Sequence, residues 1–261
     1  MGFAKNQISW LAPKIAFLLV SFSLGELGDG LNIFQGVYLV GIGWNEGSVG
    51  IALSLMGLTA LIVQPWAGDW IDKTIYDRRI LLSTASIVTA LSASAVLFVK
   101  EGNNGHNLIF VTKVIEGVAA SFIGPCLAAL TLATFGPNHF DSVMASNILW
   151  GHIGSVASSM LAGVVSYLLY PNIKYCFLVI GASALVACIF IPQLPQGDPL
   201  MGRGFQGKSA MNENGQVESL NNCDNSSLVN ENIEKQEAAP YMDILSDLKT
   251  GILCLTGFFF Q

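Results

Sequence analysis

Long apolar stretches separated by short polar segments dominate the pattern along this chain. Backbone amides cannot hydrogen-bond to lipid, so a segment that crosses a bilayer forms a helix or a strand of a closed barrel. Uninterrupted apolar runs of about twenty residues predict helices, because barrel strands show short segments of alternating polarity. Six spans are predicted, with the start of a seventh near Gly251, and they cover residues 15–40, 48–67, 80–99, 108–135, 142–170 and 175–194.

The first apolar run follows Lys5 and Lys14, an arrangement that also occurs in signal peptides. The run extends well beyond the apolar region of a signal peptide, however, and five further spans follow it. We therefore expect a retained first membrane helix.

The distribution of Lys and Arg predicts the orientation, because basic residues concentrate on the cytoplasmic side of a membrane. If the N-terminus is cytoplasmic, the outer loops contain only Lys100 and Lys174, while Lys113 falls within a span. The inner segments then contain Lys5, Lys14, Lys73, Arg78, Arg79, Arg203, Lys208, Lys235 and Lys249. We expect an integral, multi-pass membrane protein whose N-terminus and 195–249 segment are cytoplasmic.

Composition sets one segment apart from the spans. Hydrophobic residues make up 52% of the chain and charged residues 11%, against roughly 25% charged in a soluble domain. Most of the net charge of −6 comes from residues 195–249, where nine acidic and four basic residues give a local balance of −5. This segment is rich in Asn, Gly, Ser and Glu, which predicts a disordered acidic linker. The acidic balance argues against nucleic-acid binding.

The side-chain patterns of common enzyme and metal sites are missing. The chain contains no G-x-S-x-G or HExxH sequence, only three histidines, and five cysteines that form no CxxC pair. We expect no enzymatic activity, no cofactor and no metal, with the cysteines serving as small core residues.

The segment between the second and third spans contains Gly68, Asp72, Lys73, Arg78 and Arg79 in that order. With six spans and a long central linker, it resembles the loop signature of the major facilitator superfamily of transporters. That signature has Gly, three residues, Asp, a base, then a second Gly and two bases. The second glycine is missing here, and the turn is slightly longer. The resemblance implies that this segment is a cytoplasmic gating loop that contacts the other half of the protein. The alternative is a solvated turn whose acidic and basic charges cancel.

A second resemblance lies in span four. The family pattern there is an apolar residue, Arg, two residues, Gln, Gly and then small residues. Ile109, Lys113, Glu116 and Gly117 follow this spacing, with Lys in place of Arg and Glu in place of Gln. In the resembled family the base is tied to proton coupling, and spans one and four line a central cavity.

The resemblance implies an all-α membrane protein with two six-helix halves, each made of two inverted three-helix repeats. Residues 1–194 form the N-terminal transmembrane bundle, 195–249 the linker, and 250–261 the start of a truncated seventh helix. We expect a fragment that lacks the C-terminal half, while a half that pairs with another chain is the alternative.

Two acidic residues lie near the middle of span one, Glu26 and Asp29. Their spacing of three places them on one helix face. An ionised carboxylate at that depth costs about 2.5–3.5 kcal/mol on insertion scales, and such residues usually mark a pathway. Asn32 falls near the same face, while Gln35 is expected to point elsewhere. We predict a substrate or proton pathway, with a purely structural role beside a water-filled vestibule as the alternative.

Lys113 and Glu116 share a face of span four in the same way. A Lys113–Asp29 or Lys113–Glu116 pair is within reach of the lysine side chain, and the family resemblance implies that Lys113 lines the pathway. The alternatives are a self-contained Lys113–Glu116 pair within one helix, or a lysine that extends to the outer surface.

Span five is rich in small residues, among them Gly151, Gly154 and Ser158. Their three- and four-residue spacing favours close helix packing, and we assign Gly117 in span four the same role. His152 lies among them and is either a pathway residue or a hydrogen-bonded core residue.

These features predict a secondary active or facilitative transporter of a small organic solute that works by alternating access. Protons are the candidate coupling ion. The expected partners are the lipid bilayer, the solute and the missing C-terminal half. The alternative is a transport-inactive receptor or scaffold, or a half-transporter that needs a partner half.

Overall fold

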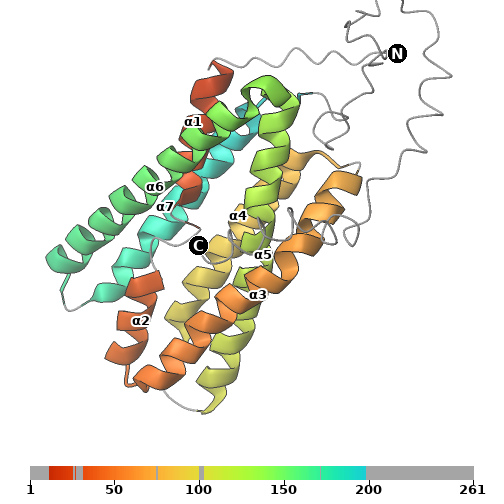
Figure 1. The fold of residues 1–261 in the computed structure, drawn as a ribbon. Helices are drawn as coiled ribbons and strands as arrows, with labels where there is room; N and C mark the ends of the chain where they lie inside the picture. Colours follow the sequence, from red (N-terminus) through yellow and green to blue (C-terminus); the bar gives the residue numbers. More distant parts are fainter. Residues whose placement is uncertain are drawn as a thin grey trace, which may run out of the picture. The chain divides into compact units, whose positions relative to one another are not determined.

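The apolar stretches form helices in a computed structural model of the chain (Figure 1). The structure describes residues 12–25, 27, 32–74, 76–99, 103–170 and 172–197, and within these residues there is no strand. The elements in chain order are α1 (Pro13–Gly25), α2 (Asn32–Gly41), α3 (Glu46–Lys73), α4 (Arg78–Ser94), the short 3-10 helix η2 (Ala95–Phe98), α5 (Asn103–Phe135), α6 (Pro137–Leu168), η3 (Ile173–Phe177), α7 (Leu178–Phe190) and η4 (Ile191–Gln193).

Predicted spans two to six are confirmed as helices. Five helical stretches in the described part are long and apolar enough to cross a membrane: Glu46–Lys73, Arg78–Phe98, Asn107–Phe135, Pro137–Leu168 and Lys174–Gln193. The described residues of the first predicted span lie mostly in two helical stretches, α1 and α2, and residues 26 and 28–31 between these stretches are not described. Glu26 and Asp29 fall between them and lie outside the described residues, as do most of the predicted linker and the whole predicted seventh helix.

The described helices pack as two groups that meet through α7 and through a direct contact between α5 and α6 (Figure 1). One group places α5 against both α3 and α4, and the other places α1 against α6. Helix α7 contacts both α4 and α1. The fully buried side chains at these contacts are largely apolar, as Phe17, Leu82 and Ile109 illustrate. The charged exceptions are therefore conspicuous.

Capping residues set the short connections between helices. Asn45 precedes α3 and accepts a hydrogen bond from the backbone N–H of Gly47 at 2.8 Å. Asp77 caps α4 by accepting from the backbone N–H of Arg79 at 3.0 Å. These side chains satisfy backbone donors that a helix start leaves unpaired. Gly136, at a φ of 72°, separates α5 from Pro137, the first residue of α6.

The prediction of a loop from Gly68 to Arg79 is wrong for its first half. Helix α3 continues through Gly68 and ends at Lys73, so that the connection to α4 is only a few residues long. Two features favour the longer helix. Ile71 is fully buried, and Lys73 forms an ion pair with Asp69 at 2.8 Å across one helical turn.

Candidate functional site

A charged pair is enclosed within α5. Lys113 is fully buried and Glu116 is 2% exposed. The Nζ atom of Lys113 donates to Oε2 of Glu116 at 2.7 Å. Their three-residue spacing places both side chains on one face of the helix, which is why they meet.

A third polar residue, Gln35, completes this cluster. Gln35 lies on α2 and is 2% exposed, and its Oε1 atom accepts a hydrogen bond from Nζ of Lys113. Sequence reasoning gave Gln35 no role because it points away from the expected Glu26–Asp29 face. The usable signal was its chemistry, since an amide side chain inside an apolar span needs a polar partner.

The Lys113–Glu116–Gln35 cluster is electrically neutral but costly to build. Removing two charges from water carries a large penalty, which only close pairing and additional hydrogen bonds offset. Charged groups inside membrane spans are rare and usually functional. The cluster therefore holds a cation and an anion side by side in the interior of the bundle.

The other predicted pathway residues do not join this cluster in the described part of the chain. Glu26 and Asp29 lie outside the described residues, and Asn32 begins α2 with its side chain undescribed. His152 lies on α6 and is exposed in this chain. A pathway role for these four residues stays a prediction.

Glycines bring the helix backbones into close contact. A Cβ atom at Gly154 would lie 1.9 Å from the carbonyl oxygen of Phe22, and a Cβ at Gly25 would lie 1.9 Å from that of Gly151. Helices α1 and α6 thus touch through their backbones at this crossing. Gly117 does the same between α5 and α3, where a Cβ would lie 2.5 Å from the carbonyl oxygen of Met56. Such small-residue contacts are a common means of association between membrane helices.

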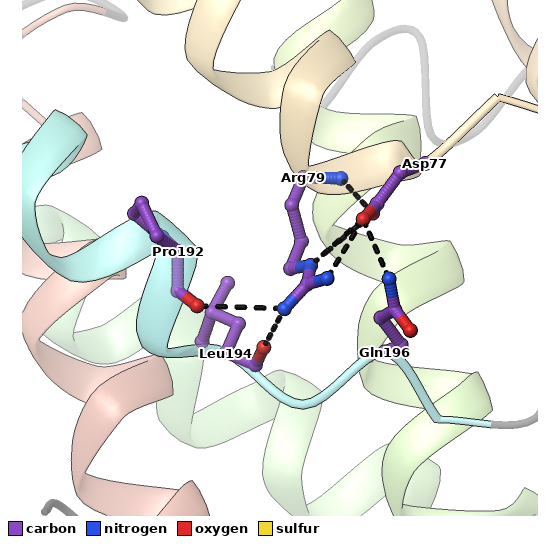
Figure 2. A network of polar contacts seen from close by, with 5 residues as sticks. All are labelled: Asp77, Arg79, Pro192, Leu194 and Gln196. Carbon is purple, nitrogen blue, oxygen red and sulfur yellow. Dashed lines mark hydrogen bonds and ion pairs between the residues drawn. The ribbon is translucent and has the colours of Figure 1, made fainter. Parts of the chain in front are cut away.

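The predicted gating segment contains a second polar network, centred on Arg79 at the start of α4 (Figure 2). The Arg79 guanidinium donates from Nη2 to Oδ2 of Asp77 at 2.7 Å and from Nη1 to the carbonyl oxygen of Leu194 at 3.0 Å. It also reaches the carbonyl oxygen of Pro192 at 3.4 Å. The Gln196 side chain donates from Nε2 to Oδ2 of Asp77 at 2.8 Å. The network therefore ties the start of α4 to the chain that follows the sixth span.

The glycine after Gln196 continues this attachment. Gly197 has a φ of +64°, a conformation that other residues adopt at a cost. A Cβ atom there would lie 2.4 Å from the backbone of Ala133 near the end of α5. The segment from Leu194 to Gly197 thus rests on the ends of both α4 and α5.

Charges in the gating segment differ in their surroundings. Lys73 is exposed and paired with Asp69, while Gly68 and Asp72 are half-buried. Arg78 is buried, and the Arg79 side chain is 11% exposed, so the alternative of a fully solvated turn is wrong for these two. Burial by itself would raise the pKa of Asp77. The hydrogen bonds from Arg79 and Gln196, with the charge of Arg79, outweigh burial and hold that pKa below its usual value.

An apolar groove of about 390 Å³ lies between α3, α4 and α5. Its walls include Trp70, Leu81, Val88, Ile115 and Phe122. It contains none of the ionisable residues of the Lys113 cluster or the Arg79 network. Polar and charged side chains orient a bound ligand and give a site its specificity. We therefore place the candidate site at the Lys113 cluster and not at this groove.

Comparison with known families places the chain. The family model of the Major Facilitator Superfamily matches residues 14–260 of the chain. The chain belongs to this family and is an integral, multi-pass membrane protein.

Curated relatives are bacterial. The chain is 29% identical over 186 residues to an uncharacterized MFS-type transporter found in two strains of Mycobacterium tuberculosis, a match that covers 70% of this chain and 43% of the relative. It is 26% identical over 121 residues to Multidrug resistance protein 1 of Bacillus subtilis, covering 44% of this chain and 28% of that protein. The chain thus spans less than half the length of these relatives. No solved structure matches the chain.

Proposed function

We propose that this chain forms the N-terminal half of a secondary active or facilitative transporter that moves a small organic solute by alternating access. The observation that supports the proposal most is the Lys113–Glu116 pair, which lies on a helix of membrane-spanning length and is buried inside the bundle. Replacing a buried ion pair with apolar residues of similar volume is often neutral or stabilising, so such a pair is weak evidence for a stabilising role. An ionisable pair inside a membrane span favours a role in binding or coupling.

The orientation proposed for the chain places the N-terminus, the gating segment and the linker in the cytoplasm. The positive-inside bias supports this assignment. The Lys113 cluster then lies toward the outer half of the bundle, because α5 runs from the outer to the inner side. The Arg79 network lies at the inner surface, where a gate between the two halves would close.

The mechanism follows from the neutrality of the cluster. A solute or proton that engages Glu116 would free Lys113 to interact with other groups in the cavity. Approach of Lys113 to Glu26 or Asp29, the two acids predicted from the sequence, would then release a proton from them. Substrate binding between this half and the C-terminal half would favour one of the two open states, because a ligand shifts an equilibrium by its difference in affinity. Protons are the proposed coupling ion.

Solute-induced currents in the full-length protein test this proposal. Proteoliposomes on a solid-supported membrane would be exposed to jumps of amino acids, sugars and organic acids, with and without a pH gradient. We expect at least one class to give a current that Lys113→Ala removes. Lys174→Ala is the matched control, because Lys174 is exposed in the connection before α7. Equal currents in wild type and Lys113→Ala would remove the pair from the mechanism, and specific binding without flux of any class would indicate a receptor.

A further inference from the structure

The three members of the Lys113 cluster come from two different helices. Lys113 and Glu116 both lie on α5 and therefore move together. Gln35 lies on α2 and reaches the pair through its side chain. The Gln35–Lys113 hydrogen bond is thus a connection that a relative movement of α2 and α5 would break, whereas the Lys113–Glu116 ion pair would survive it.

Helix α2 is held chiefly by neighbours other than α5. It packs against α3, where a Cβ atom at Gly36 would lie 3.5 Å from the Leu53 side chain. Its Tyr38 ring meets the Phe177 ring of η3 edge-on, with centroids 5.5 Å apart. Through its hydrogen bond to Lys113, Gln35 therefore links the position of α2 to the position of the Lys113 ammonium.

The chemistry of an amide suits this role. A lysine ammonium has three donor hydrogens and no acceptor, so a buried lysine needs several acceptors around it. Glu116 supplies one acceptor and neutralises the charge. Gln35 supplies a second without adding charge, since an amide does not ionise. Loss of this acceptor would leave a buried donor unsatisfied, which favours movement of the ammonium toward another acceptor.

We propose that Gln35 is a positioning residue: it holds the Lys113 ammonium beside Glu116 and releases it when α2 moves away from α5. The inference rests on the proposed transport function and specifies how that site is regulated. Movement of the second part of span one, for example as solute enters, would withdraw the Gln35 acceptor. Lys113 would then be free to engage a new partner in the cavity.

A double-mutant cycle in the full-length protein tests the inference. The variants are Gln35→Leu, which keeps the approximate size but removes the acceptor, Lys113→Met, and the two combined. Gln64→Leu is the matched control, because Gln64 is an exposed glutamine on α3. Flux of the solute identified for the wild type is measured as Vmax and KM, and thermal unfolding is followed in the same detergent-purified samples.

We expect Gln35→Leu to lower Vmax by about tenfold, because Lys113 is then no longer held beside Glu116 and its release no longer depends on movement of α2; the size is that expected for losing a hydrogen bond to a charged group. KM should change less, because the acceptor acts on Lys113 and not on the solute. Gln64→Leu should retain wild-type flux. In the Lys113→Met background, Gln35→Leu should have little further effect on either unfolding or residual flux, because its partner is already gone.

Failure of the inference can be separated from failure of the proposed function. If Lys113→Met removes flux while Gln35→Leu behaves like Gln64→Leu, transport stands and the positioning role is overturned. The same conclusion follows if Gln35→Leu lowers stability but leaves Vmax unchanged, since that marks a purely structural contact. If Lys113→Met itself leaves flux unchanged, the proposed site fails, and the inference fails with it.

Discussion

Gly154 lies directly against the carbonyl oxygen of Phe22, so close that a Cβ atom at residue 154 would be 1.9 Å from it. One turn away, Gly25 meets the carbonyl oxygen of Gly151 in the same way. At the α1–α6 crossing each helix thus supplies one glycine and one carbonyl oxygen to the contact. The separation of these helices is therefore set by backbone atoms, which cannot move aside as a flexible side chain would.

Gly154→Ala should destabilise the chain because its methyl group would overlap backbone at the crossing. Overpacking typically costs about 1–3 kcal/mol, and the upper end is expected where the obstacle is backbone. Gly163→Ala on the same helix is the control, since the nearest atom of another element to a Cβ at residue 163 would be a Phe34 ring carbon 4.0 Å away. The free energy of unfolding in mixed detergent micelles measures both. Equal stability of the two variants would show that α1 and α6 do not meet at this distance.

Asp77 has two separable roles, as the cap of α4 and as the partner of Arg79. Asp77→Asn should keep the cap, because asparagine is equally favoured at this position, and lose the ion pair with Arg79 and the hydrogen bond from Gln196. Asp77→Ala should lose the cap as well, with an additional cost of about 0.5–2 kcal/mol. Chemical unfolding of the two variants and of wild type measures the difference. If both variants lose the same stability, the capping bond to Arg79 N–H contributes nothing.

Stability should fall in acid partly through Asp77. Its pKa is lower in the folded chain than in the unfolded chain, so its contribution is fully present above the unfolded value, which is about 3.9. That contribution is lost as the pH falls from about 4 through the folded pKa. Wild type should therefore lose its stability advantage over Asp77→Asn in this window and keep it at pH 5 to 7. Parallel unfolding midpoints for the two proteins from pH 6 to pH 3 would contradict this linkage.

The Lys113–Glu116 pair should respond unequally to single and double replacement. Lys113→Met leaves Glu116 buried without its counter-charge, a change that typically costs about 3–5 kcal/mol. Replacing both, as Lys113→Met with Glu116→Leu, removes the uncompensated charge and should recover much of that loss. Unfolding in mixed micelles measures Lys113→Met, Glu116→Leu and the double variant. A double variant that is as unstable as the sum of the two singles would mean that the residues do not form a pair.

Some features of the site were predictable from spacing within one helix. The Lys113–Glu116 contact follows from a separation of three residues, and the close packing at Gly154 follows from small residues repeated at helical spacing. The continuation of α3 to Lys73 was missed, because charged residues after an apolar run look like a loop. An ion pair to Asp69 and the burial of Ile71 extend the helix instead.

The sequence by itself determined that the chain is a set of membrane helices with a few ionisable residues inside them. A bilayer imposes this through local requirements, namely internal backbone hydrogen bonds and apolar runs of sufficient length. Tertiary structure decided which distant groups meet. Gln35 and Lys113 are 78 positions apart, and Arg79 and Leu194 are 115 apart. Such contacts depend on how each helix is rotated and packed against its neighbours, and spacing along the chain does not encode that rotation.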